Sequence, residues 1–402
     1  MFQAIQRLPQ WKRTLYIVFV AQLISAIGFS NIFSFLPLYI QTLETRTSLS
    51  VEFLSGLVFS AQAMTMMIAS PFWGMVADRY GRKLMVQRAM FGGAVIILLM
   101  GFVQSAEQLI ILRAVQGLVT GSISASSALV AAETPRRRTG YAMGMLQVGF
   151  WGGLATGPLL GGIVADAFGY PSAFTVTSIL LAVAGVLVGV GVREAFAPPK
   201  RAGRRGPNPL SGWKRILGSS GVKLAYGLRF LSSLGRIMIV PIVPLFISTL
   251  LPLGAQVNTF TGIVVGSASA ASTATAFYTG RLGDQIGHQR ILKISALAAG
   301  LFYLPQGLVT EAWQLLVLQV LAGAATGGTI PTLSALLANY TRPGDEGSVY
   351  GLDNSIVSAS RFVAPLAGGG IAHWLGYRGT FVAIGLLFWL IVLPIVWRLP
   401  ES

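Results

Sequence analysis

Apolar residues occur in long runs that recur throughout this chain. Each run is about 20 residues long or more, which is the length an α-helix needs to cross the hydrocarbon core of a bilayer. The runs predict twelve membrane-spanning helices, at residues 14–42, 53–76, 84–104, 108–131, 141–165, 172–192, 221–249, 258–281, 291–310, 312–338, 348–372 and 378–398. We therefore expect an all-α membrane protein.

The composition agrees with this class. Of the 402 residues, 53% are hydrophobic and only 10% are charged, whereas soluble domains carry about 25% charge. Such a chain has too few charges to cover the surface of a soluble globule and too many apolar residues to stay disordered. It has no cysteine and only two histidines, so thiol chemistry and a Cys/His metal cluster are excluded, and we expect no metal or cofactor.

The distribution of the charges predicts the topology. The net charge is +16, and 23 of the 29 Lys and Arg residues fall in the loops on one side of the predicted helices. The opposite side has only Arg46 and Arg378. Because cytoplasmic loops are enriched in Lys and Arg, both termini are expected in the cytoplasm, in a multi-pass protein of the cell (plasma or inner) membrane. Basic residues spread over every inner loop do not indicate a nucleic-acid site.

The chain contains an internal duplication with an offset of 206–207 residues. The segment Pro37–Leu43 matches Pro244–Leu250, and three further sets of glycines recur in the same order. This predicts three parts: a six-helix bundle at 1–192, a polar cytoplasmic linker at 193–220 and a second six-helix bundle at 221–402. Two repeats of six spans enter the membrane with the same topology, which is the parallel arrangement of transporters that bind substrate between two halves.

Two glycine-containing sequence patterns lie in the first half of the chain. The first inner loop has the pattern G-x-x-x-D-R-x-G-R-K, formed by Gly74, Asp78, Arg79, Gly81, Arg82 and Lys83. The fifth predicted helix has G-x-x-x-G-P-x-x-G-G, formed by Gly153, Gly157, Pro158, Gly161 and Gly162. Physically, the first is a charged loop that can form and break a latch. The second is a smooth, bendable helix face that allows close packing.

These patterns, together with Arg113–Gly121 on the fourth helix, resemble motifs A, C and B of the major facilitator superfamily. Motif C is associated with its drug:proton antiporters, and with the repeat the resemblance covers essentially the whole chain. It implies the major facilitator fold, with twelve helices in two parallel six-helix repeats. It also implies a central cavity lined by the first, fourth, seventh and tenth helices, and alternating access of that cavity to the two sides.

Polar residues inside the predicted helices indicate where a substrate would bind, because ionisable groups within a bilayer usually face the bundle interior. Arg229, Ser232, Ser233 and Arg236 form one stripe on the seventh helix. The predicted cavity residues are Gln22, Ser25, Phe29, Asn31, Gln116, Arg229, Arg236, Asn354 and Arg361.

The intramembrane acids are scarce. Many drug exporters of the superfamily that this chain resembles carry an acidic residue in the first, seventh or tenth helix. This chain has no acidic residue in those predicted helices. Proton coupling is therefore assigned to Arg113, Asp353 and Glu133.

The sequence therefore predicts a secondary transporter that exports small amphipathic molecules, such as antibiotics, by proton antiport. An alternative is a transporter of anionic or zwitterionic amphiphiles or lipids with the same fold. The chain has no Walker A motif, which argues against direct use of ATP, and no H-E-x-x-H or G-x-S-x-G motif, which argues against an enzyme. The expected partners are the amphipathic substrate, protons and the bilayer, and the expected state is a monomer.

Overall fold

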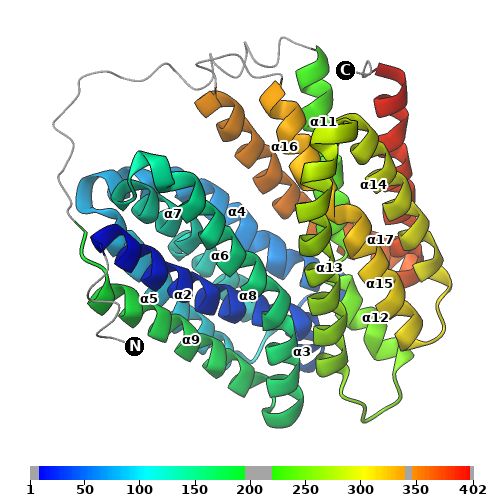
Figure 1. Cartoon of the computed structure of the whole chain (residues 1–402). Coiled ribbons are helices and arrows are strands. Elements are labelled where there is room, and N and C mark those ends of the chain that lie inside the picture. The colour runs from blue at the N-terminus through cyan, green and yellow to red at the C-terminus, as the bar shows by residue number, and fades with distance from the viewer. Residues whose placement is uncertain (1–8, 195–219, 340–345, 399–402) are drawn as a thin grey trace. The chain divides into compact units, whose positions relative to one another are not determined.

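The computed structural model describes residues 9–194, 220–339 and 346–398, which are helical almost throughout (Figure 1). In chain order the helices are α2 (Gln10–Asn31), η1 (Ile32–Ser34), α3 (Leu36–Thr42), α4 (Val51–Tyr80), α5 (Arg82–Met100), α6 (Ala106–Val119), α7 (Ser122–Glu133), η2 (Arg136–Arg138), α8 (Thr139–Phe168), α9 (Tyr170–Gly191), α11 (Ser220–Met238), α12 (Ile242–Leu250), α13 (Val257–Ile286), α14 (His288–Tyr303), η3 (Leu304–Leu308), α15 (Ala312–Gly327), α16 (Thr329–Asn339) and α17 (Glu346–Arg398).

Within these residues, eleven helical segments are long and apolar enough to cross a membrane. The last of them, Gly351–Val392, covers 42 residues, about twice the length that one crossing needs. It is interrupted at Gly376, whose backbone is non-helical with φ 71° and ψ 174°. Counting the two sides of Gly376 separately gives the twelve expected crossings, and the all-helical fold class is confirmed.

The chain forms two compact units. Unit 1 contains Met1–Ser48, Ala61–Ala202 and Asn258–Gly262, and unit 2 contains Leu49–Ser60, Gly203–Val257 and Ile263–Ser402. Each unit therefore includes a short segment from the other sequence repeat. Most of the predicted linker at 193–220 lies outside the described residues, and the predicted domain boundaries stay a prediction.

The sequence duplication is visible in the backbone. Gly81 and Gly287 join consecutive helices with φ of 97° and 94°, and Gly169 and Gly376 do so with φ of 82° and 71°. Both pairs are separated by the repeat offset. A positive φ is strained for residues with a Cβ, so glycine permits the same tight helix junction in each repeat.

Four of the predicted helices are broken into two pieces, and these are the first, fourth, seventh and tenth. The breaks lie at residues 32–35, 120–121, 239–241 and 328. They recur at corresponding places of the two repeats, which the hydropathy pattern did not predict. Each break frees backbone groups from the helical hydrogen-bond ladder, and such interruptions in transporters lie where backbone lines a cavity.

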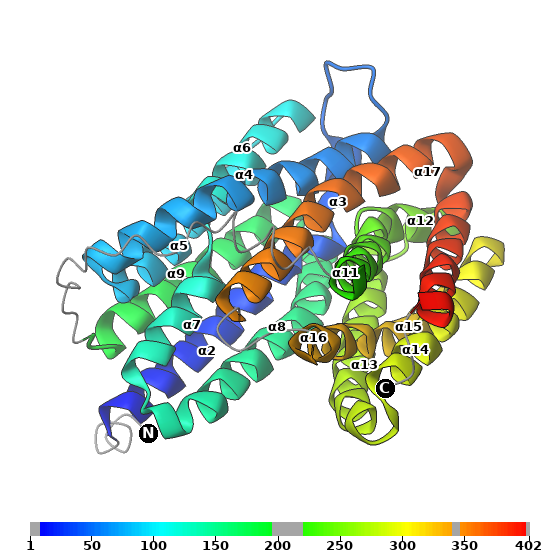
Figure 2. The same ribbon diagram turned by 90° about the horizontal axis from the view of Figure 1, so that it is seen from above.

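Close helix packing holds each unit together. In unit 1, α2 lies along α8 and α9 (Figure 1). In unit 2, α11 lies beside α17 and contacts it on both sides of Gly376 (Figures 1 and 2). Because lipid is as apolar as the helices, packing and hydrogen bonds rather than hydrophobic burial favour these contacts.

Candidate functional site

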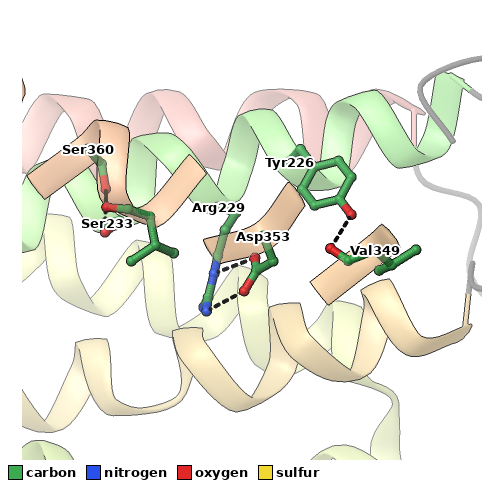
Figure 3. Close-up of polar contacts among 7 residues, drawn as sticks. Tyr226, Arg229, Ser233, Val349, Asp353 and Ser360 are labelled. Carbon is green, nitrogen blue, oxygen red and sulfur yellow. Dashed lines mark hydrogen bonds and ion pairs between the residues drawn. The ribbon is translucent and has the colours of Figure 1, made fainter. Parts of the chain in front are cut away.

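An ion pair joins α11 to α17 inside unit 2 (Figure 3). The Arg229 Nε donates to Asp353 Oδ1 at 3.0 Å, and its Nη2 donates to Oδ2 at 3.1 Å. The two side chains are only 13% and 16% exposed. A planar guanidinium matches both oxygens of a carboxylate, so this bidentate geometry is the strong form of the contact.

Two hydrogen bonds on either side of the ion pair align the same helices. The Tyr226 hydroxyl donates to the Val349 carbonyl at 3.0 Å, and the Ser360 hydroxyl donates to the Ser233 hydroxyl at 2.7 Å (Figure 3). The three contacts occur in the same order along both helices, so α11 and the part of α17 before Gly376 run parallel and are held in a fixed register. Arg229 and Ser233 of the predicted stripe on the seventh helix therefore face α17.

The other predicted cavity residues of unit 2 lie close to this contact. Arg236 is partly buried, whereas Asn354 and Arg361 are exposed. Arg236 lies one helical turn beyond Ser233. Among the residues that the structure describes, neither Arg236 nor Arg361 forms an ion pair.

A second buried polar cluster lies in unit 1. Arg113 is 1% exposed, and its Nη1 donates to Gln62 Oε1 at 3.0 Å and to Gln116 Oε1 at 2.8 Å. The structure thus brings together Arg113 and Gln116, as predicted residues, with Gln62, which sequence reasoning missed. The side chain of Gln62 has no distinguishing motif, so only the packing of α4 against α6 identifies it.

The predicted cavity residues of α2 have different surroundings. Gln22 is buried, and its Oε1 has no hydrogen-bond partner in the described part of the chain. Ser25 donates to the Ala21 carbonyl of its own helix at 2.6 Å. The ring of Phe29 lies edge-on to that of Phe33, with centroids 6.1 Å apart.

Asn31 is fully buried in a helix-packing contact. Its Nδ2 donates to the Thr177 hydroxyl of α9 at 2.8 Å, and its Oδ1 lies where a side chain at Gly161 would be. In this structure Asn31 therefore faces α8 and α9 rather than an open surface.

The glycines of motif C explain how α8 packs. A Cβ on Gly153, Gly157 or Gly161 would overlap α2, and one on Gly162 would overlap the Asn258 backbone at the start of α13. Pro158 also takes part, because its carbonyl lies against Gly262 of α13. Motif C thus forms two close helix contacts within unit 1, on two sides of α8.

Motif A lies at the junction of α4 and α5. Gly81 adopts the positive φ noted above, and the Arg82 and Lys83 backbone N–H groups donate to Glu194 at 2.9 and 2.8 Å. The Lys83 Nζ also donates to the Gly189 carbonyl at 2.7 Å.

Two further motif A residues, Arg79 and Gly74, make few contacts with other helices. Arg79 is exposed and lies over the Tyr80 ring, and Gly74 has nothing packed against it. The Asp78 side chain is outside the described part of the structure. The predicted latch stays a prediction.

The third predicted coupling residue, Glu133, lies at the end of α7. Its Oε2 accepts a hydrogen bond from Gln10 at 3.4 Å. Arg113 and Glu133 thus belong to separate contacts in unit 1, and Asp353 belongs to unit 2.

A carboxylate that sequence reasoning missed is Asp166, near the end of α8. It accepts hydrogen bonds from the backbone N–H groups of Asn258 and Thr259 at 3.3 and 2.7 Å, and from the Asn258 amide at 2.6 Å. A carboxylate at this position satisfies the free N–H groups of the first turn of α13 and interacts favourably with the helix dipole. In the sequence, only its position four residues after the end of motif C could have indicated Asp166 as a candidate.

Comparisons with known proteins agree with the fold and motifs. The family model of the Major Facilitator Superfamily matches residues 18–229 and again 225–402. The chain is 33% identical over 384 residues to the multidrug resistance protein MdtG of Serratia proteamaculans, covering 95% of this chain and 92% of that protein. It is 32% identical over 375 residues to the MdtG of Dickeya zeae, covering 92% and 91%.

Solved structures show the same architecture at low sequence identity. The nucleoside transporter NupG, solved as a mutant, aligns with a TM-score of 0.80 and 10% identity, over 98% of this chain and all of that one. A bacterial homologue of the human lysosomal transporter Spinster, inward-facing and unoccupied, aligns with a TM-score of 0.77 and 13% identity, over 96% of both chains.

Proposed function

Because this chain belongs to the major facilitator superfamily, we propose that it exports small amphipathic molecules from the cell in exchange for protons. Relatives that are 32–33% identical over most of the chain are named multidrug resistance proteins, which supports drugs as the substrates. Motif C, found in full, supports antiport. The protein is a membrane transporter and not an enzyme.

The export is expected to proceed by alternating access in the cytoplasmic membrane, with both termini in the cytoplasm. The proton-motive force supplies about 2.3 kcal/mol per charge for each 100 mV of membrane potential, and any pH gradient adds to it. The positive-inside distribution of Lys and Arg supports this orientation.

The Arg229–Asp353 ion pair is the single observation on which the coupling proposal rests. Asp353 lies inside a membrane-spanning segment and is little exposed. A proton that binds this carboxylate cancels its charge and removes the partner of Arg229. Because an unpaired charge in a low-dielectric site is costly, protonation changes the stability of the α11–α17 contact. Proton binding to Asp353 is thereby linked to the packing of α11 against α17.

The test separates proton coupling from substrate movement. In proteoliposomes, Asp353→Asn should abolish proton-driven accumulation of a drug while retaining drug–drug exchange at equal pH, because the amide does not titrate. The matched control is Asp284→Asn, which removes an exposed carboxylate of the same unit and should keep both activities.

Two outcomes would contradict the proposal. One is full proton-driven transport by Asp353→Asn, and the other is the same loss in the control. Since the variant leaves Arg229 without its partner, the double variant Asp353→Asn/Arg229→Gln should restore stability in detergent without restoring proton-driven transport.

A further inference from the structure

The fourth predicted helix is interrupted where α6 meets α7. Thr120 is extended, with φ −78° and ψ −175°, and Gly121 has φ 124° and ψ 27°. The Thr120 N–H still donates to the Gln116 carbonyl at 2.9 Å. Helical bonding resumes where the Ala125 N–H donates to the Gly121 carbonyl at 3.3 Å. Because a helix end leaves its last carbonyls without backbone partners, the junction needs donors from elsewhere.

Two side chains from neighbouring helices supply such donors. The Trp73 indole Nε1 of α4 donates to the Leu118 carbonyl at 2.6 Å. The Arg88 Nη2 of α5 donates to the Thr120 carbonyl at 3.5 Å. A cation near the C-terminal end of a helix also interacts favourably with the helix dipole. Side chains of α4 and α5 thus bind the broken end of α6.

The two donors also contact each other. The Arg88 Cζ lies 3.4 Å from the centre of the Trp73 ring, which is a close cation–π stack. The Arg88 Nε and Nη1 are buried and have no hydrogen-bond partner among the described residues. The indole ring and the Thr120 carbonyl are therefore the groups that hold the guanidinium in place. We call Trp73 and Arg88 the junction clamp.

The packing around the junction fixes α6 but not the direction of α7. A Cβ on Gly92 of α5 would overlap the Val119 side chain, so α5 lies directly against the last residue of α6. Gly117 lies against the Gln62 carbonyl of α4, and Arg113 donates to the Gln62 side chain. Since α6 is anchored in this way up to its end, the course of α7 depends on the backbone of the junction.

The second repeat has a break at the corresponding place, with different residues around it. At the repeat offset of 206, Thr279 and Ile294 take the places of Trp73 and Arg88. The Thr279 hydroxyl donates to the Thr275 carbonyl of its own helix at 2.8 Å, and Ile294 is 58% exposed. Neither side chain can form a cation–π stack with the other. The junction clamp is thus a property of the first half and not a requirement of the shared fold.

The clamp and a continuous helix compete for the same carbonyls. In an uninterrupted helix the Leu118 carbonyl would accept from the Ser122 N–H, four residues on. The Thr120 carbonyl would likewise accept from the Ser124 N–H. In the broken arrangement the first N–H groups of α7 have no helical partner, and Gly121 has no side chain to cap them. The junction can therefore exist in two arrangements that exclude each other.

We propose that Trp73 and Arg88 are positioning residues for transport, which hold the fourth predicted helix in its broken arrangement and thereby set the course of α7. Loss of the clamp favours the continuous helix, because the freed carbonyls then regain backbone N–H partners. A transporter that changes its helix arrangement depends on the balance between two such arrangements. The effect of the clamp on transport rests on the proposed export function, whereas its effect on the junction does not.

Hydrogen–deuterium exchange at the junction tests the clamp, in the full chain in lipid nanodiscs, without drug or proton gradient. Trp73→Phe removes the indole donor, and Arg88→Met removes the cation. In the double variant the N–H groups of residues 122–124 should exchange at least about fivefold more slowly, because they enter helical hydrogen bonds. A variant that only destabilised the fold would exchange faster, so the direction of the change separates positioning from loss of stability.

Three further variants serve as controls. Arg88→Lys keeps a cation that can lie over the ring and should exchange as the wild type does. Trp151→Phe makes the same aromatic change in α8, and Arg137→Met removes an exposed arginine of the same unit. Both should leave the exchange of the junction unchanged.

Unchanged or faster exchange in the double variant would overturn the clamp, as would equal slowing in Arg88→Lys. Transport is measured separately, as drug–drug exchange at equal pH in proteoliposomes, which the double variant should slow by at least about fivefold. Normal drug exchange by a variant with slowed hydrogen exchange would overturn the role of the clamp in transport. A wild-type chain that moves no drug would contradict the proposed function and would leave the hydrogen-exchange result as it stands.

Discussion

At the scale of single residues, the buried arginines differ in what surrounds them. Arg229 binds the only described acid within reach on α17, whereas Arg113 is held by the side-chain oxygens of two glutamines. Neutral acceptors leave the charge of Arg113 in place but satisfy part of its hydrogen-bonding capacity. Removing such an acceptor from a buried cation is costly, because water cannot replace it.

Gln116→Leu should therefore destabilise unit 1. The loss of one charge-assisted acceptor is expected to cost about 1–3 kcal/mol and to lower the thermal unfolding midpoint in detergent. The control is Gln147→Leu, which makes the same change at an exposed position of α8. Unchanged midpoints in both variants would show that the Arg113 contact adds nothing to stability.

At the scale of the helices, the close contacts are made where side chains are absent. Three glycines of motif C spaced four residues apart bring α8 against α2, and the fourth approaches α13. The same helix has glycines that serve no such purpose, since nothing lies within 4 Å of a Cβ built on Gly144. The spacing of the motif C glycines, rather than the glycine content of α8, thus sets the packing.

Gly157→Val should prevent the native packing of α8, because its side chain would overlap Ser30 and the Ile27 carbonyl of α2. We expect a loss of folded, monodisperse protein in size-exclusion chromatography. Gly144→Val makes the same substitution in the same helix at an open position and should elute as the wild type does. A folded and active Gly157→Val chain would contradict the assignment of this face as a packing surface.

At the scale of the whole molecule, the asymmetry of basic residues predicts the orientation in the membrane. Arg46 lies in a loop of the poorly charged side, and Arg137 lies between α7 and α8 on the basic side. Both are exposed. Because the chain has no cysteine, one introduced cysteine reports its own side without background.

Arg46→Cys should react with a membrane-impermeant maleimide in intact cells, whereas Arg137→Cys should react only after the cells are permeabilised. This follows from the positive-inside rule. Labelling is quantified on the purified chain, and the cysteine-free wild type gives the background. The opposite pattern would invert the topology and place both termini outside.

The sequence alone determined the fold class, the twelve crossings, the duplication and the family. These features depend on properties that act locally or repeat along the chain. A helix needs about 20 apolar residues to cross a bilayer, and motifs occupy consecutive positions. Hydropathy was insensitive to the breaks in four helices, because the residues at the breaks carry no charge and each run stays long enough to cross a bilayer.

Only the tertiary structure decided which polar residues meet. The stripe containing Arg229 was visible in the sequence, but its bond to Asp353 joins residues 124 positions apart, and depends on the rotation and register of two helices. The same holds for Gln62 beside Arg113 and for Asp166 at the start of α13. Asn31, predicted in the cavity, is buried between helices. Side-chain direction follows from packing against neighbours, which hydropathy and spacing do not contain.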